Sequence, residues 1–354
     1  MLWPRGQAPV PLANSVGPPT GLHQLEAPPR DATYRLVIAA VRLLACQPVA
    51  VRIHPVIEDA ATVVSAVAES VGHPLSLHSE LDVDVYRLRA TDDGPDGPDL
   101  VARVFGPDVE RATVGTAAHV LQKLAGTRFP AERCPTADPV LALAGDRHLL
   151  VTEYVEPSPA PGPGFILAWC AGLLSRLATR SAEDLPGGGG WHRLGPTPAR
   201  EIDRALSLGG EVGTSVAELV DTLAEADDGA GLPEALIHAD LTPSNAVPRG
   251  DQAPVIIDWI GVGRGPRIWP LAFLLYVAGP TGAPRALDRY AGSVPLSEEE
   301  RARLPAVMIA RPLTLALWAV AHERMTARQA IAQHRGHRGR VEAITSALNG
   351  PDRA

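Results

Sequence analysis

The chain has 354 residues, a formal net charge of −8 and a hydrophobic content of 45%. It is long enough for two lobes or domains with a sizeable core, and its acidic balance argues against a nucleic-acid partner. Three scattered cysteines, Cys46, Cys134 and Cys170, form no CxxC pair, so they predict reduced thiols in a cytoplasmic protein and argue against a cysteine-based zinc site.

The N-terminal part of the chain predicts a tail followed by a helical segment. Residues 1–30 are rich in Pro, Gly and Ala and lack periodicity, which predicts a disordered tail. They also lack the basic and apolar regions of a signal peptide. Helical spacing of apolar residues over 31–72 predicts an N-terminal helical extension. Its most apolar part, residues 36–51, contains Arg42 and Pro48 and is too short and too interrupted to span a membrane.

Residues 73–155 predict a small sheet with one helix. Apolar and β-branched residues over 83–88 and 100–105 indicate two strands, and a turn rich in Asp, Gly and Pro separates them. A helix is predicted over about 107–126, because a proline begins this segment and a glycine follows it. The apolar run over 149–155 predicts a further strand.

Residues 165–354 are predicted to be mainly helical, and a Pro/Gly connector over 156–164 leads into them. Four consecutive glycines, Gly187–Gly190, predict a flexible loop within this part. The segment Leu296–Glu300 resembles a capping box, which predicts the start of an apolar helix. Apolar stripes at helical spacing predict helices over about 165–179, 198–208, 214–226 and 306–318.

The most informative stretch of the chain is the segment from Leu236 to Trp259. His238, Asp240 and Asn245 stand in the pattern HxDxxxxN, and Asp258 later ends an apolar, β-branched run. Phosphoryl transfer from ATP uses one carboxylate to accept the proton of the attacking hydroxyl, while an amide and a second carboxylate hold Mg²⁺ against the phosphates. Each residue alone could cap a turn or a strand end. Their spacing, together with the flanking apolar runs, favours the chemical interpretation.

The pattern HxDxxxxN…(I/V)(I/V)DW resembles the catalytic segment of the aminoglycoside phosphotransferase and choline kinase-like family, which comprises small-molecule relatives of the protein kinases. The resemblance implies an α+β, two-lobed protein-kinase-like fold. Residues 73–155 would form a small N-lobe with an antiparallel sheet, and residues 165–354 a larger, mainly helical C-lobe that carries the catalytic loop. It also implies an ATP- and Mg²⁺-dependent phosphotransferase that acts on a hydroxyl of a small molecule, without a nucleic-acid or membrane partner. The oligomeric state stays open.

The resemblance assigns roles within the catalytic segment. Asp240 would orient and deprotonate the acceptor hydroxyl, and His238, its catalytic neighbour, would brace the loop rather than take part in proton transfer. Asn245 and Asp258 would ligate Mg²⁺.

It also assigns a nucleotide site on the predicted sheet. Arg103 stands where kinases carry a lysine to the phosphates, and its guanidinium can grip phosphate through two N–H groups. The backbone groups of Glu153 and Val155 would face the adenine edge. Arg103 as a solvated strand residue and 149–155 as a plain core strand are the alternatives.

Two features depart from the family pattern. Ser76–Asp82 lies where a glycine-containing phosphate loop is expected, and it has no glycine. The helix after Arg103 has Ala117 at the position where relatives place a glutamate that pairs with the basic strand residue. Glu110 could substitute for that glutamate, or it could only complement the helix dipole.

The sequence leaves three functions open. The first is a small-molecule kinase with an aminoglycoside-like or other natural-product acceptor. The second is a Ser/Thr kinase that acts on a peptide in natural-product maturation, and the third is a non-catalytic pseudokinase that binds nucleotide or a partner protein. The motif carboxylates favour the first two, whereas the missing glycine and helix glutamate favour the third. Glu298–Glu300 could bind a cationic acceptor or only cap the helix that they begin.

Overall fold

The computed structural model describes residues 60–82, 84–91, 97–107, 109–188, 196–321 and 324–350. The predicted tail, the part of the predicted helical extension before residue 60 and the apolar stretch over 36–51 lie outside the described residues.

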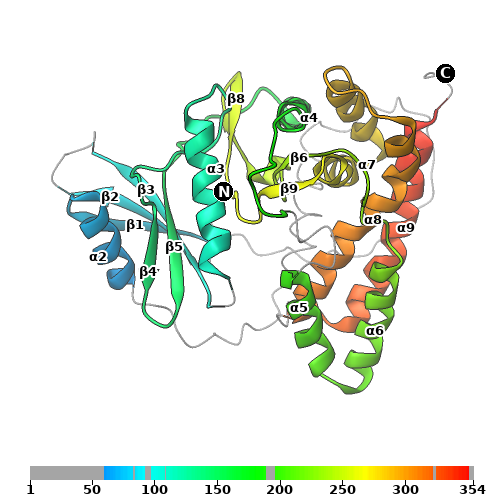
Figure 1. Ribbon diagram of the computed structural model, residues 1–354, viewed down its shortest axis with the longest axis horizontal. Helices are drawn as coiled ribbons and strands as arrows, with labels where there is room; N and C mark the ends of the chain where they lie inside the picture. The colour runs from blue at the N-terminus through cyan, green and yellow to red at the C-terminus, as the bar shows by residue number, and fades with distance from the viewer. Residues whose placement is uncertain are drawn as a thin grey trace, which may run out of the picture.

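The described chain forms two lobes, as expected for an α+β protein-kinase-like fold (Figure 1). The N-lobe contains a five-stranded antiparallel sheet in the order β1-β2-β3-β5-β4. Strands β1, β2 and β3 pair in sequence, β5 pairs with β3, and β4 lies at the edge beyond β5. The strands are β1 (Leu75–Asp82), β2 (Val85–Ala90), β3 (Asp99–Phe105), β4 (Val140–Leu143) and β5 (Arg147–Glu153).

Both faces of the N-lobe sheet are covered by a helix. Helix α2 (Ala60–Val71) packs on one face, where its buried valines join Ala102 and Val104 of β3 in one apolar cluster. Helix α3 (Arg111–Ala125) packs on the opposite side, against β4 and β5. Because side chains alternate along a strand, Arg103 points away from α2 and toward the side that faces the C-lobe.

The predicted position of the phosphate loop is wrong. The stretch Ser76–Asp82 is part of strand β1, which pairs with β2 from Leu75 opposite Ala90 to Asp82 opposite Val85. The turn between the two strands therefore lies further along the chain and includes Asp84. Asp84 adopts a left-handed conformation there, with a φ of 59°, which Asp tolerates better than most residues. The tip is acidic and has no glycine.

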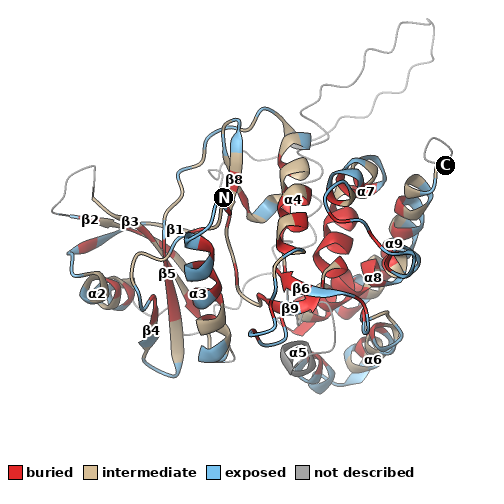
Figure 2. Cartoon of the chain, turned by 45° about the horizontal axis from the view of Figure 1, so that its top comes forward, coloured by how far each residue is buried: buried red, intermediate tan, exposed pale blue. Residues whose placement is uncertain are grey.

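The C-lobe is built from long helices around two short antiparallel strand pairs. Helix α8 is long and apolar enough to cross a membrane by composition, but 72% of its most apolar window is buried within the protein. It packs against α5, α6, α7 and α9, so α8 is a core helix (Figure 2). The helices are α4 (Pro163–Leu177), α5 (Pro196–Ser207), α6 (Gly210–Ala224), α7 (Ile268–Ala291), α8 (Glu298–Ala321) and α9 (Ala327–Leu348).

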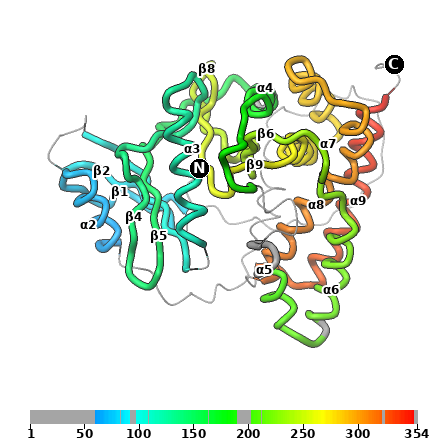
Figure 3. The backbone as a smooth tube through the Cα atoms, in the orientation of Figure 1, coloured from blue at the N-terminus to red at the C-terminus, as the bar shows by residue number. Residues whose placement is uncertain are grey.

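Two short antiparallel pairs hold the catalytic segment. The first pair brings β9 back beside β6, and the second is the hairpin of β7 and β8, which runs between α3 and α4 (Figure 3). The segment that carries the HxDxxxxN pattern connects the two pairs through a single 3₁₀ turn. The elements are β6 (Glu234–Ile237), η3 (Pro243–Asn245), β7 (Ala246–Arg249), β8 (Gln252–Ile256) and β9 (Gly263–Pro266).

The first half of the glycine run Gly187–Gly190 is held rather than flexible. Gly188 N–H donates to Arg264 O at 2.8 Å. A Cβ atom on Gly188 would lie 2.4 Å from the backbone nitrogen of Gly263, and one on Gly263 would lie 2.6 Å from Pro186 O. Glycine is needed at both positions because the two backbones touch. The remaining two glycines of the run lie outside the described residues.

The chain has a single lysine, Lys123, in the last turn of α3. Its side chain is 49% exposed and forms an ion pair with Asp184. The lysine is therefore a surface residue, and the basic residue of β3 that faces the C-lobe is Arg103.

Candidate active site

The structure brings the three motif residues Asp240, Asn245 and Asp258 together at the edge of the C-lobe that faces the N-lobe sheet. Asn245 Nδ2 donates to Asp240 O at 2.9 Å. The backbone of Asn245 in turn accepts a 3.0 Å hydrogen bond from Ile257 N–H, next to Asp258. The loop after β6 and the loop after β8 are thereby fixed against each other.

His238 lies beneath this loop and is fully buried. Its Nδ1 accepts from Asp240 N–H at 3.0 Å, and Nε2 lies 3.2 Å from Ile257 O. An imidazole that carries its proton on Nε2 satisfies both contacts. Burial lowers the pKa of His238 to about 4. The Trp259 ring packs edge-on against the imidazole, with 4.7 Å between the ring centroids. The neutral imidazole therefore holds the Asp240 backbone in place, and its role as a brace of the catalytic loop stays a prediction.

The Asp240 carboxylate remains accessible, with 32% of its side chain exposed. Oδ1 accepts from Thr242 Oγ1 at 3.3 Å. Arg311 of α8, whose side chain is 7% exposed, places Nη2 3.8 Å from Oδ2. Burial raises the pKa of Asp240, and the Arg311 charge opposes that rise. A carboxylate with a raised pKa that a ligand can still reach suits a general base.

Asn245 and Asp258 offer the oxygen ligands that Mg²⁺ prefers. The amide nitrogen of Asn245 is engaged by Asp240 O, so its amide oxygen is the atom left for a cation. The Asp258 side chain is 36% exposed. No group of three His, Cys, Asp or Glu residues suited to a metal occurs within the described part of the chain. A kinase-type site does not need one, because phosphate oxygens and water complete the coordination.

Arg103 contacts Asp258 directly, since its Nη1 lies 2.6 Å from Asp258 Oδ1. Burial disfavours the guanidinium charge, but Asp258, Glu132 and Asp82 together raise the pKa of Arg103 above its usual value. Arg103 is therefore a buried, paired cation rather than a solvated strand residue. Glu110 is the N-cap residue of α3 and is not among the acids that act on Arg103.

Glu132 is a buried acid of the site that sequence reasoning missed. Its side chain accepts hydrogen bonds on both oxygens, from Asp258 N–H to Oε1 and from Thr152 Oγ1 to Oε2, each at 3.0 Å. The residue is 6% exposed, and burial raises its pKa. Glu132 lies far from the motif in sequence and belongs to no recognisable pattern, so only the fold reveals it.

The hinge residues Glu153 and Val155 follow the sheet into the connector. Tyr154 N–H donates to Asp99 O of β3 at 2.7 Å. Neighbouring residues of an antiparallel strand alternate in direction, so the backbone groups of Glu153 point to the opposite side, where its N–H donates to Arg133 O at 2.8 Å. Its carbonyl is directed the same way. Contact of Glu153 and Val155 with a base remains a prediction.

The acidic start of α8 caps the helix. Ser297 N–H donates to Glu300 Oε2 at 2.8 Å, and Glu300 N–H donates to Ser297 Oγ at 3.1 Å. Glu300 is fully buried and receives two further hydrogen bonds from Arg267, at 2.7 and 2.8 Å. It is therefore not available to a cationic acceptor.

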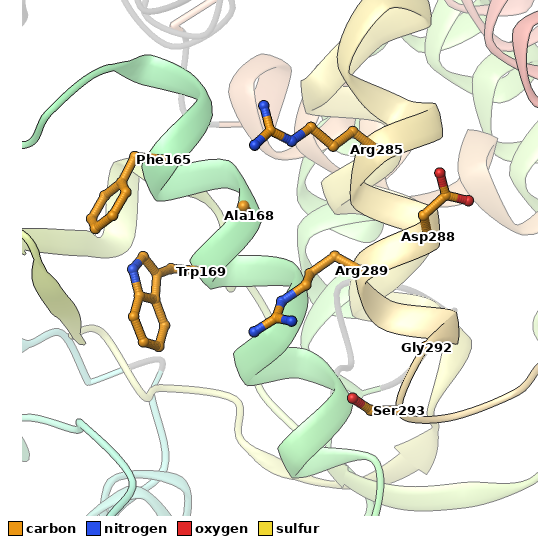
Figure 4. Close-up of a pocket in the computed structure, with 8 residues that line it drawn as sticks. All are labelled: Phe165, Ala168, Trp169, Arg285, Asp288, Arg289, Gly292 and Ser293. Atoms are coloured by element: carbon orange, nitrogen blue, oxygen red, sulfur yellow. The ribbon is translucent and has the colours of Figure 1, made fainter.

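A surface groove of about 590 Å³ lies between α4 and α7 (Figure 4). Phe165 and Trp169 of α4 face Arg285 and Arg289 of α7 across it. Arg289 lies over the α4 backbone, because a Cβ atom on Gly172 would be 3.2 Å from its Nε. None of the motif residues lines this groove, so phosphoryl transfer is not placed there.

Comparison with known proteins agrees with this geometry. A sequence model of the phosphotransferase enzyme family matches residues 75–304. No curated protein is similar enough to match the chain.

Solved structures share the fold at low sequence identity. An aminoglycoside phosphotransferase from Alicyclobacillus acidocaldarius is 18% identical, with a TM-score of 0.52 over 85% of this chain and 98% of that one. A microcompartment-associated aminopropanol kinase is 19% identical, with a TM-score of 0.57 over 81% of this chain and 98% of that one. The amicoumacin kinase in complex with AMP-PNP, Ca²⁺ and Ami is 14% identical, with a TM-score of 0.53 over 76% of this chain and 87% of that one.

The family match covers both lobes, from the first strand of the sheet into α8, and it includes every motif residue described above. The chain therefore belongs to the phosphotransferase enzyme family and is a phosphotransferase with a kinase-like fold.

Proposed function

We propose that the protein transfers the γ-phosphoryl group of ATP to a hydroxyl of a natural product or a related small molecule, with Mg²⁺ as the metal. The observation that carries this proposal is the arrangement of Asp240, Asn245 and Asp258. Hydrogen bonds hold the loops that carry these residues together, and Arg103 contacts Asp258 from the N-lobe. The amicoumacin kinase, a structural neighbour, contains a nucleotide analogue and a divalent cation, which supports the choice of cofactors. The free thiols Cys134 and Cys170 support a cytoplasmic location.

The proposed reaction moves one proton and one phosphoryl group. Asp240 accepts the proton of the acceptor hydroxyl while that oxygen bonds to the γ-phosphorus. The bond from the γ-phosphorus to the bridging oxygen breaks, and its electron pair stays on ADP. Bound Mg²⁺ would neutralise phosphate charge and would be held by Asn245 and Asp258. Arg103 binds the phosphates, so positioning and charge neutralisation supply most of the rate.

A pseudokinase is the second candidate, because one observation favours it. Nucleotide binding would need both Arg103 and Asp258. Yet Arg103 Nη1 lies 2.6 Å from Asp258 Oδ1, and the two charges neutralise each other. A chain that had lost nucleotide binding could keep such a pair as a structural link between the lobes.

Thermal unfolding separates the two candidates. The wild type is melted with ATP in the presence and absence of Mg²⁺, beside Asp258→Asn. The catalytic proposal predicts a Mg²⁺-dependent rise in the midpoint that the variant loses, since a ligand at a hundred times its Kd stabilises by about 2.7 kcal/mol. ADP release is then assayed over a panel of hydroxylated natural products and Ser/Thr peptides. No shift at millimolar ATP contradicts the proposal.

A further inference from the structure

The segment Pro130–Arg133 links the two lobes through its backbone. Arg133 O accepts from Glu153 N–H of β5 at 2.8 Å. On the other side, Ile256 N–H of β8 donates to Pro130 O at 2.8 Å, and Glu132 N–H donates to Ile256 O at 3.0 Å. Glu132 is thereby held at a fixed point between the hinge strand and the strand that leads to Asp258.

The Glu132 side chain extends this link into the nucleotide site. One oxygen accepts from Thr152 of β5 and the other from the backbone N–H of Asp258. Asp258 has a φ of 67°, a left-handed conformation that costs free energy in a residue other than glycine. The bond from Glu132 stabilises that conformation, and so it determines where the Asp258 carboxylate points.

Glu132 also acts on Arg103, because both residues contact Asp258. Burial lowers the pKa of Arg103, whereas Asp258 and then Glu132 raise it. The helix position that would pair with Arg103 is Ala117, which is fully buried and uncharged. Arg103 pairs with Asp258. Asp258 would also hold the metal ion. Glu132 is the further acid that acts on the largely buried guanidinium of Arg103, and a largely buried cation without a partner is costly.

We propose that Glu132 is the positioning residue of the nucleotide site and takes the place of the absent helix glutamate. It anchors the backbone of Asp258 and keeps Arg103 in place once Mg²⁺·ATP engages Asp258. This proposal rests on the proposed function, because it concerns how the same nucleotide is held.

The test compares Glu132→Gln with a matched control, Glu300→Gln. Glutamine at 132 can keep an acceptor for Asp258 N–H and a polar partner for Thr152, so the substitution removes charge and little else. Glu300 is also a buried carboxylate that accepts hydrogen bonds on both oxygens, from Arg267 and Ser297, but it lies away from the nucleotide site. Kd for Mg²⁺·ATP is measured by calorimetry, and the melting temperature of each nucleotide-free variant reports its fold. We expect E132Q to raise Kd by about tenfold, the size typical of coupled neighbours, and E300Q to leave Kd unchanged.

A double-mutant cycle with Arg103→Gln separates positioning from a general structural effect. If Glu132 acts through Arg103, E132Q changes Kd far less in the R103Q background than in the wild type. Equal changes in both backgrounds, or a wild-type Kd for E132Q, would overturn the proposal. If E132Q does not melt cooperatively, Glu132→Asp takes its place, since its shorter side chain cannot reach both Thr152 and Asp258. Weaker binding by a folded E132D supports the proposal, and wild-type binding overturns it.

The wild type itself distinguishes the two proposals. If it does not bind Mg²⁺·ATP, the proposed function and the role of Glu132 both fail. If it binds while E132Q binds equally well, only the role of Glu132 fails.

Discussion

At the residue scale, some polar groups of the motif are free to take part in the reaction, whereas others hold the loop in place. His238 has both ring nitrogens occupied by backbone groups, so it cannot also accept a substrate proton. Asp240 keeps an exposed carboxylate whose pKa is raised by burial. The acid–base role therefore belongs to Asp240.

Replacing Asp240 by Asn is expected to slow phosphoryl transfer about a thousandfold, since a positioned base contributes roughly 10²–10⁴. Nucleotide affinity should change little, because Asp240 is not among the proposed metal ligands. Steady-state kinetics and calorimetry with Mg²⁺·ATP measure the two quantities. Asp251→Asn, at an exposed turn between β7 and β8, is the control. A D240N enzyme with nearly full activity would contradict the assignment.

Arg311 is expected to control the pH dependence of the reaction. Its charge opposes the rise in the pKa of Asp240 that burial causes. Arg311→Met removes that opposition, so the carboxyl should stay protonated to higher pH and the acidic limb of the kcat/KM profile should move up. Arg301→Met, at an exposed residue of the same helix, should leave the limb in place. A shift of the acidic limb of the kcat/KM profile to lower pH in R311M would refute this electrostatic coupling.

At the element scale, two backbone contacts and one helix interface hold the elements of the C-lobe together. The strand that follows the catalytic segment returns beside β6, and its Gly263 meets Gly188 so closely that no side chain fits. On the far side of the lobe, α7 and α9 pack through Tyr276 and His337. All three contacts join residues that are distant in sequence.

Gly263→Ala should destabilise the protein by about 2 kcal/mol or more, because the added methyl group overlaps the backbone at Pro186. The matched control is Gly115→Ala in α3, where a Cβ atom meets nothing within 4 Å. In a helix interior that exchange should stabilise by up to about 1 kcal/mol. Urea unfolding measures the change in the free energy of unfolding for each variant. An unchanged stability of G263A would show that the loop can move to accommodate the methyl group.

The buried His337 side chain is expected to lower the free energy of unfolding as the pH falls. It is 4% exposed, its Nδ1 bonds to the Tyr276 hydroxyl, and burial, with His334 and Arg340 nearby, lowers its pKa from 6.5 to about 4. A histidine with a depressed folded pKa stabilises fully above pH 6.5, and that stability is lost as the pH falls toward 4. The expected loss is on the order of 3 kcal/mol.

The measurement is the free energy of unfolding between pH 7 and pH 4.5 for the wild type and His337→Gln. The variant should show a smaller loss, although not a flat profile, because His238 has a pKa of about 4 and acts over the same range. His78→Gln, at an exposed residue of β1, controls for the removal of a histidine. An unchanged slope in H337Q would exclude this role of His337.

At the scale of the whole molecule, the sequence predicts most where the chemistry is local. Asp240, Asn245 and Asp258 lie in the loop after β6, in the 3₁₀ turn and in the loop after β8, so their spacing in the sequence predicts them as one set. Glu132 and Arg311 reach the same site from the segment after α3 and from α8. Periodicity cannot reveal such contacts, because they depend on how separate elements pack.

The misplaced phosphate loop has a related cause. Ser76–Asp82 is mostly polar and exposed, which resembles a loop when the residues are considered alone. It is an edge strand that pairs on one side only, with β2. An edge strand with charged side chains is well protected against unwanted pairing, and it does not need the apolar alternation that identifies inner strands.

The single lysine has a practical consequence for chemical labelling. Reagents that acylate the phosphate-binding lysine of kinases would find no amine beside Asp258, because the basic group there is the guanidinium of Arg103. The one lysine side chain, Lys123, lies instead on the outer surface of the N-lobe helix. Lys123 is therefore the one side chain that amine-directed dyes would label, and the protein would escape detection by probes directed at a lysine beside the phosphates.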